Sequence, residues 1–192
     1  MKIYDISQEV FSCRSYPGDP MPKKQTLSAT QNGDLYNLTA FSMCAHNGTH
    51  IDAPFHFLDQ GKTVEQMELH TFVGDCYVAR HNGDVTGADA VAILHKAGGV
   101  PRILIAGPVT VTAEAAEAFA NSGICLLGNE SQTVGPENAP MQVHKILLEE
   151  DVVLLEGVVL RDVPEGRYFL SAVPLNLAGS DGAPCRAYLI EK

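Results

Sequence analysis

A run of eleven residues, 46–56, constrains this chain more than any other feature. It reads His-Asn-Gly-Thr-His-Ile-Asp-Ala-Pro-Phe-His, so three of the chain's seven histidines and one aspartate fall within it. Imidazole nitrogens and carboxylate oxygens are the ligands that zinc and similar divalent ions prefer. Composition alone does not explain four such groups in so short a run. The segment therefore predicts a metal site built from His46, His50, Asp52 and His56.

The same run indicates how those side chains are presented. Gly48 and Pro54 disfavour a helix, and the β-branched residues between them favour extended backbone. Residues 36–45 are expected to be extended and lead directly into the run. The ligands are therefore expected at a strand end and in a tight loop, not at helical spacing.

The composition is that of a globular protein, and residues 1–192 are expected to form one domain. The hydrophobic content of 45% and the charged content of 19% are ordinary for this class. No apolar run approaches the roughly 18 to 20 residues that span a bilayer, and the first residues lack the features of a signal peptide. We therefore expect a cytoplasmic protein with no membrane partner.

The charge and the cysteines exclude two further classes. A net charge of -10 and scattered lysines and arginines argue against a nucleic-acid partner, which needs a basic stripe. The five cysteines lie far apart and form no CxxC pair. Neither a disulfide framework nor a structural zinc site made of thiolates is indicated.

The middle of the chain alternates between strand and helix patterns. We expect strands at 74–81, 102–106, 124–127 and 152–155, and helices at 87–97, 113–122 and 141–149. Thr86 and Thr112 are predicted N-caps for the first two helices. This alternation favours a parallel sheet. Extended segments at the chain ends, namely 2–10, 168–177 and 186–190, suggest a second, smaller sheet of antiparallel or mixed type. The predicted class is thus α/β.

Two downstream residues are candidates to complete the metal site. His144 lies in the predicted helix 141–149, and Glu156 follows four aliphatic residues. A carboxylate in such an apolar run is costly to bury unless it is paired or bound to metal. The alternatives are ordinary: a surface or core histidine in a helix, and a solvated glutamate at a strand end.

The motifs resemble, in sequence and in order, one known family. The pattern His46-x-Gly48-Thr49-His50-x-Asp52-x-Pro54-x-His56 is similar to the signature of the cyclase-like metal-dependent hydrolases, which include bacterial kynurenine formamidases and isatin hydrolases. Residues 16–19 resemble the family's early aromatic-Pro-Gly-Asp loop. Residues 143–157 resemble its second metal segment, with the same twelve-residue gap from His to Glu. Residues 181–186 resemble its closing Asp-Gly-Ser-Pro-x-Arg stretch.

This resemblance implies a role for each matching position. His46, His50 and Asp52 would hold one divalent metal, and Asp52 would bridge to a second. The second ion would be held by His144, with Glu156 reaching both; the ions would be Zn²⁺ or Mn²⁺. His56 would be the acid/base group. The implied fold is a swivelling β/β/α domain of three layers, and the implied assembly is a homodimer or homotetramer.

Two places depart from the kynurenine formamidase pattern. The early loop usually carries Trp, where this chain has Tyr16. Residues 129–135 read Asn-Glu-Ser-Gln-Thr-Val-Gly, where that pattern has Ile-Asp-Thr-Pro-Ser-Val-Asp. Both places are expected to shape the substrate pocket, and Tyr16 is the candidate substrate-binding residue. For Phe55, Phe57 and Tyr16 alike, the alternatives are to line that pocket or to pack in the core.

The resulting functional hypothesis is a hydrolase that cleaves a C–N bond of an amide or formamide small molecule, as an arylformamidase does. A divalent metal lowers the pKa of bound water toward about 7, and His56 would carry a proton to the departing nitrogen. One alternative is a hydrolase of a cyclic amide of the isatin type, or of a lactone. Another is a metal-dependent small-molecule binding protein without catalysis.

Overall fold

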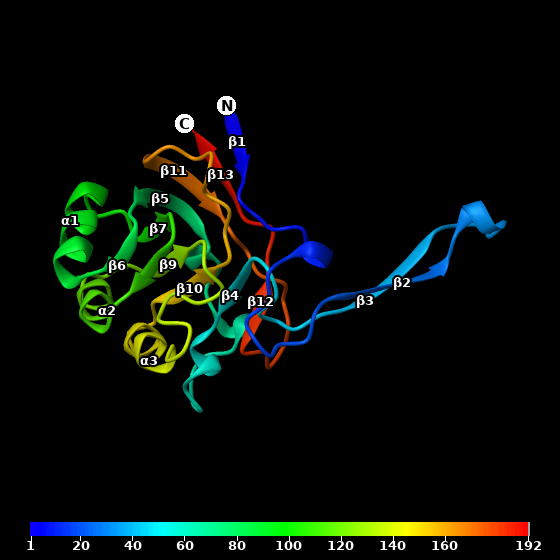
Figure 1. Ribbon diagram of the computed structural model, residues 1–192, viewed down its shortest axis with the longest axis horizontal. Helices are drawn as coiled ribbons and strands as arrows, with labels where there is room; N and C mark the ends of the chain where they lie inside the picture. The colour runs from blue at the N-terminus through cyan, green and yellow to red at the C-terminus, as the bar shows by residue number, and fades with distance from the viewer. Residues whose placement is uncertain (192) are drawn as a thin grey trace.

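One curled sheet of nine strands dominates the computed structural model, which describes residues 1–191 (Figure 1). The strand order is β1-β13-β11-β5-β7-β9-β10-β4-β12. The parallel centre consists of β5 (Val73–Arg80), β7 (Arg102–Ala106), β9 (Leu126–Asn129) and β10 (Val153–Glu156). The antiparallel flanks are β4 (His50–Asp52) and β12 (Gly182–Pro184) on one side, and β11 (Gly166–Ser171), β13 (Tyr188–Glu191) and β1 (Lys2–Asp5) on the other.

Three helices cover one face of the parallel strands: α1 (Gly87–Ala97), α2 (Ala113–Ala120) and α3 (Met141–Glu149). Thr86 caps α1 through a capping box with Asp89, and Gly98 ends that helix in the left-handed conformation. Thr112 caps α2 by accepting a hydrogen bond from a backbone N–H of the first turn. The predicted helices and both caps are therefore confirmed. No helix within residues 1–191 has the length and apolar character needed to cross a membrane.

Both faces of the central sheet are buried, which explains the near-continuous apolar runs of its strands. Side chains alternate along a strand, so Ile103 and Ile105 pack toward the helices. Leu104 between them packs into a second core with residues of the flanking strands. Helices, parallel strands and curled flanks thus form the layers of the domain, and the α/β class with a mixed central sheet is confirmed.

The chain ends differ in detail from the prediction. The strand expected at 2–10 ends at Asp5, and residues 10–12 form a short 3-10 helix. The end strands do not build a sheet of their own, because β11 pairs antiparallel with β5 and β13 pairs with β11. Two smaller sheets exist, but other segments form them: β2 (Lys23–Ser28) with β3 (Leu38–Ser42), and β6 (Gly83–Val85) with β8 (Val109–Val111).

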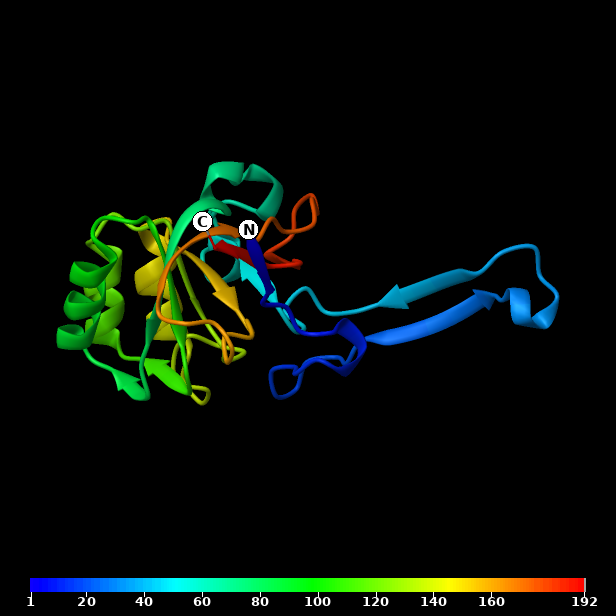
Figure 2. The ribbon, with the colours of Figure 1, turned by 90° about the horizontal axis from the view of Figure 1, so that it is seen from above.

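The pair β2–β3 is a long hairpin that projects from the body of the molecule, as both ribbon views show (Figures 1 and 2). We call residues 23–42 the arm. The sequence indicated extended backbone at 36–45 but gave no signal for β2. Four further 3-10 turns complete the structure: Thr30–Asn32 at the tip of the arm, Pro54–His56, Val64–Gln66 and Leu69–Thr71.

A glycine in β12 is required for the close approach of the histidine segment. A Cβ atom at Gly182 would lie 2.6 Å from His46 Cε1 and 2.7 Å from the carbonyl oxygen of Ile51. We expect Gly182→Ala to lower the free energy of unfolding by roughly 1 to 3 kcal/mol, the usual cost of overpacking, and to displace the His46 ring. Denaturant unfolding measures this. Gly87→Ala is the matched control, since its Cβ would have no neighbour closer than 3.4 Å, and equal stability of the two variants would contradict the prediction.

Candidate metal centre

Strand pairing sets three of the candidate ligands on one face of the sheet. His50 and Asp52 are two residues apart on β4, so their side chains share a face. In the antiparallel register with β10, Glu156 lies directly opposite His50, which places its side chain on that same face. This is the face covered by the helices, because Leu154, opposite Asp52, packs in the helix-side core.

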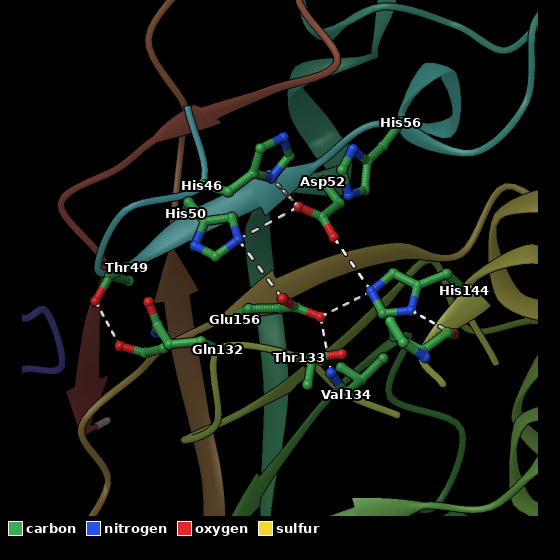
Figure 3. Close-up of polar contacts among 12 residues, drawn as sticks. His46, Thr49, His50, Asp52, His56, Gln132, Thr133, Val134, His144 and Glu156 are labelled. Carbon is green, nitrogen blue, oxygen red and sulfur yellow. Dashed lines mark hydrogen bonds and ion pairs between the residues drawn. The ribbon is translucent and has the colours of Figure 1, made fainter. Parts of the chain in front are cut away.

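His144 lies on helix α3 and approaches Asp52 and Glu156 from the face of the sheet that the helices cover. Its Nδ1 lies 2.9 Å from the carbonyl oxygen of Pro140, one turn earlier. Its Nε2 lies 3.2 Å from Glu156 Oε1 and 3.5 Å from Asp52 Oδ2. Figure 3 shows His144 pointing at both carboxylates, although it is far from Asp52 in the sequence. The two halves of the predicted site therefore meet in one place.

His46 and His56 complete the cluster on the other side of Asp52 (Figure 3). His46 Nδ1 lies 2.8 Å from Asp52 Oδ1, and its Nε2 lies 2.9 Å from Asp181 Oδ2. His56 is the last residue of the 3-10 turn Pro54–His56. Its ring stacks on that of His46 at 4.1 Å between centroids, and its Nδ1 lies 3.1 Å from the same Asp181 oxygen. Asp181 thus joins the two rings.

Sequence reasoning did not assign a role to Asp181. The signal was available, because residue 181 opens the Asp-Gly-Ala-Pro-Cys-Arg stretch that resembles the family's closing motif. What the sequence does not reveal is that β12 pairs with β4, which places Asp181, the residue before β12, beside the histidine segment.

The two central carboxylates are almost completely buried. Asp52 is 1% exposed and Glu156 is 2% exposed, and within residues 1–191 their ion-pair partners are histidines. Burial favours the neutral acid, but hydrogen bonds from His144, His46 and His50 outweigh it and hold the pKa of Asp52 well below its usual value. The pKa of Glu156 is lowered in the same way, against burial and the charge of Asp52, by His144 and His50.

The same contacts act on the imidazoles in the opposite direction. Burial lowers the pKa of each ring, but the neighbouring carboxylates raise it more. The pKa of His46 is raised to about 11 by Asp181 and Asp52. Asp52 and Glu156 raise the pKa of His50 to about 9 and that of His144 to about 10. These contacts therefore favour the protonated form of His46, His50 and His144 beside the two buried carboxylates.

The donor set fits one or two divalent cations. Potential ligand atoms of His46, Asp52 and His56 lie within 4.8 Å of one another, and so do those of His50, Asp52 and Glu156. Asp52 belongs to both groups, as a bridging carboxylate would. Nitrogen and carboxylate oxygen without thiolate suit zinc, manganese or iron.

A cavity of about 260 Å³ opens onto this cluster. Tyr16 and Phe57 line it together with the histidines, whereas Phe55 is exposed and does not line it. Segment 129–135, which differs from the kynurenine formamidase pattern, contributes Gln132 and Thr133 to the cavity wall. The Gln132 Oε1 and Thr133 Oγ1 atoms are buried, and no protein group within residues 1–191 hydrogen-bonds to them. The residues that distinguish this chain from the kynurenine formamidase pattern therefore border the candidate centre.

Comparison with known proteins agrees with this geometry. A family model described as putative cyclase matches residues 4–136. The chain is 35% identical to a kynurenine formamidase of Erythrobacter litoralis, over 99% of this chain and 94% of that protein. A solved structure described as a potential metal-dependent hydrolase with cyclase activity has a TM-score of 0.83 at 29% identity, covering 98% of this chain and 96% of its own.

A more distant structure shows how widely the fold extends. Isatin hydrolase A from Labrenzia aggregata has a TM-score of 0.85 at 18% identity, covering 100% of this chain and 94% of its own. At that identity the likeness is one of fold. The match of the family model over most of the sequence, and the full-length likeness to the Erythrobacter protein, carry the assignment: this chain belongs to the putative cyclase family.

Proposed function

We propose that this chain is a metal-dependent hydrolase that cleaves the C–N bond of an amide or formamide small molecule. The observation that carries the proposal is the meeting of His144 and Glu156 with the histidine segment around one cavity. The full-length likeness to proteins named kynurenine formamidase supports the C–N bond as the target. A single domain, residues 1–192, would perform the reaction.

The metal ligands in this proposal are His46, His50, Asp52, His144 and Glu156. Their buried carboxylates supply the negative charge that offsets one or two divalent cations, and Zn²⁺ and Mn²⁺ both suit the nitrogen and oxygen donors. Such a cation polarises a carbonyl and makes water a nucleophile near neutral pH. The Pro140 carbonyl orients the His144 ring, which leaves its Nε2 directed at the two carboxylates.

His56 is proposed as the proton carrier. Its side chain is 27% exposed, more than any of the other cluster histidines, and its ion-pair partner is Asp181 instead of the buried carboxylates. A carboxylate at Nδ1 fixes the orientation and tautomer of an imidazole. The other ring nitrogen is then the atom that would pass a proton to the departing amine.

The cavity wall decides which substrate fits. Tyr16 is proposed to contact the substrate, because it lines the cavity while its hydroxyl donates to the carbonyl oxygen of Glu137. Gln132 and Thr133 stand where the kynurenine formamidase pattern has Pro and Ser. We therefore leave formylkynurenine as one candidate among aryl formamides, with isatin-like cyclic amides and lactones as the second candidate.

A binding protein without catalysis is the remaining alternative. Such a protein would need the metal ligands but no partly exposed imidazole beside them. The presence of His56 therefore favours an enzyme. Metal-dependent turnover of a panel of aryl formamides and isatin-like rings would support the proposal. Tight binding of these compounds without turnover would support the alternative. The cytoplasmic location and the homodimer or homotetramer expected from the sequence stay predictions.

The His56→Ala variant tests the division between ligand and proton carrier. We expect the rate to fall by at least about a hundredfold, the usual scale for general acid/base catalysis, while elemental analysis still finds metal. His95→Ala, an exposed histidine on α1, is the control and is expected to keep full activity. Loss of metal from the His56→Ala protein would reassign this residue as a ligand.

Asp181→Asn tests whether the carboxylate positions His56. We expect kcat to fall by about 10- to 100-fold, with a smaller change in KM, when the assay contains saturating metal. The excess metal matters because Asp181 also contacts His46. Asp162→Asn, which alters a solvent-exposed carboxylate, is the control. Recovery of the full kcat by added metal would show that Asp181 acts only on metal affinity.

The raised histidine pKa values predict a pH dependence of metal binding. Ligand imidazoles must be neutral, so metal binding near pH 7 should release protons. The apparent affinity should rise with pH up to the pKa values of His50, His144 and His46, which are about 9, 10 and 11. Calorimetry in buffers of different ionisation enthalpy counts these protons. In the metal-free protein, the stability due to these ion pairs is complete below the unfolded pKa of 6.5 and is lost as the pH rises through about 9 to 10. Binding without proton release would contradict this account.

A further inference from the structure

A second cavity adjoins the one that opens onto the candidate metal centre. It has a volume of about 420 Å³ and shares Tyr16, Gln132 and Thr133 with the metal-centre cavity, so these three side chains border both spaces. Its remaining wall includes Arg14 and Glu137. A substituent of a small molecule bound at the metal centre would therefore reach this second cavity past the shared side chains.

The side chains shared by the two cavities are polar and incompletely paired. Gln132 donates through Nε2 to the carbonyl oxygen of Gly48, but its Oε1 atom is buried and accepts no hydrogen bond from the part of the chain that the structure describes. The Oγ1 atom of Thr133, a residue that is 4% exposed, is also without a partner there. Buried polar atoms normally have a hydrogen-bond partner. The boundary between the cavities therefore suits a polar substituent better than an apolar one.

Arg14 supplies the fixed positive charge of the second cavity. Within residues 1–191, no other lysine or arginine lines this cavity or the metal-centre cavity. The guanidinium of Arg14 has no hydrogen bond or ion pair to any described residue. Four other arginines each use their guanidinium to bind a backbone carbonyl or a carboxylate: Arg80, Arg102, Arg167 and Arg186. The Arg14 guanidinium is therefore available to a ligand.

The acidic residues that share a cavity with Arg14 do not neutralise it. Glu137 belongs to the same cavity wall, yet no ion pair joins the two side chains among the described residues. Glu130 shares a third cavity with Arg14, but its carboxylate accepts hydrogen bonds from the backbone N–H groups of Gly107 and Leu160. Because the whole chain carries a net charge of -10, an anionic ligand needs a local cation of this kind to approach the site.

Backbone contacts hold Arg14 in a fixed position relative to the metal centre. Its N–H donates to Gln8 Oε1 at 2.8 Å, and its carbonyl oxygen accepts from the N–H of Gly48 at 3.0 Å. Ser15 Oγ accepts from Asn47 Nδ2 at 2.8 Å. Asn47 and Gly48 belong to the histidine segment itself. The backbone of Arg14 is thus tied to the candidate ligands while its side chain stays unpaired, which suits a residue that contacts a ligand.

We propose that Arg14 is a specificity-determining residue that binds a carboxylate on the substrate, so that the enzyme prefers anionic amides or formamides to neutral ones. This inference rests on the proposed function, because it names the substrate class of the same site. A guanidinium binds a carboxylate through two parallel N–H···O hydrogen bonds, and such charge-assisted bonds are stronger than neutral ones. Thr133, which borders both cavities, would donate its hydroxyl to the same substituent.

Turnover of matched substrates tests the proposal. The probes are formanilides with a short ring side chain that ends either in a carboxylate or in the neutral carboxamide of nearly the same shape. With Zn²⁺ or Mn²⁺ added, we expect the natural protein to have a kcat/KM about 10- to 100-fold higher for the carboxylate, the range for a hydrogen bond to a charged group. In Arg14→Gln this ratio should fall to about 1. Each ratio compares two substrates of one protein, so differences in metal content or folding cancel.

Arg161→Gln is the matched control, because Arg161 is a solvent-exposed arginine that lines neither cavity. This variant should keep the ratio of the natural protein. Equal kcat/KM values for the two substrates in the natural protein would overturn the proposal. An unchanged ratio in Arg14→Gln, or an equal fall in Arg161→Gln, would overturn it as well.

Failure of the proposed function gives a different result, namely no metal-dependent turnover of either compound. Calorimetry then decides on Arg14, because it measures the dissociation constants of the same two compounds without turnover. The carboxylate should bind about 10- to 100-fold more tightly than the carboxamide, and Arg14→Gln should abolish this difference. Equal binding of the two compounds to the natural protein would rule out the role of Arg14.

Discussion

The structure of the candidate centre depends on two carboxylates buried side by side. Asp52 and Glu156 repel each other and have lost their water, so each needs cationic neighbours. Three different elements deliver those neighbours: the loop before β4 supplies His46, β4 itself supplies His50, and α3 supplies His144. A buried anionic pair surrounded by imidazoles is stable either with protons on the rings or with metal in their place. The metal-bound state is the one that would support hydrolysis. In that state the imidazole rings are neutral, and the positive charge of the metal lies beside the carboxylates.

Backbone pairing on both sides holds the short strand β4, which carries Asp52, in place. Its three residues are held by β10 on one side and β12 on the other. Glu156 also accepts a hydrogen bond from the backbone N–H of Val134, which ties the wall of the cavity to the centre. Thr49 adds a second tie, since its hydroxyl donates to the carbonyl oxygen of Gly157. The segment that differs from the kynurenine formamidase pattern is therefore held against the cluster of histidines and carboxylates by a backbone contact.

Much of this arrangement was predictable from the sequence, and the failures have physical causes. Strands that are buried on both faces appear in the sequence as continuous apolar runs. Thr86 and Thr112 are N-caps that mark where two helices begin. The α/β core was therefore predictable. The histidine segment was found because its ligands are close in sequence. β2 was missed because Lys-Lys-Gln-Thr has no buried face and so no alternating pattern. Asp181 was missed because its value comes from the pairing of β12 with β4, a contact that no local pattern encodes.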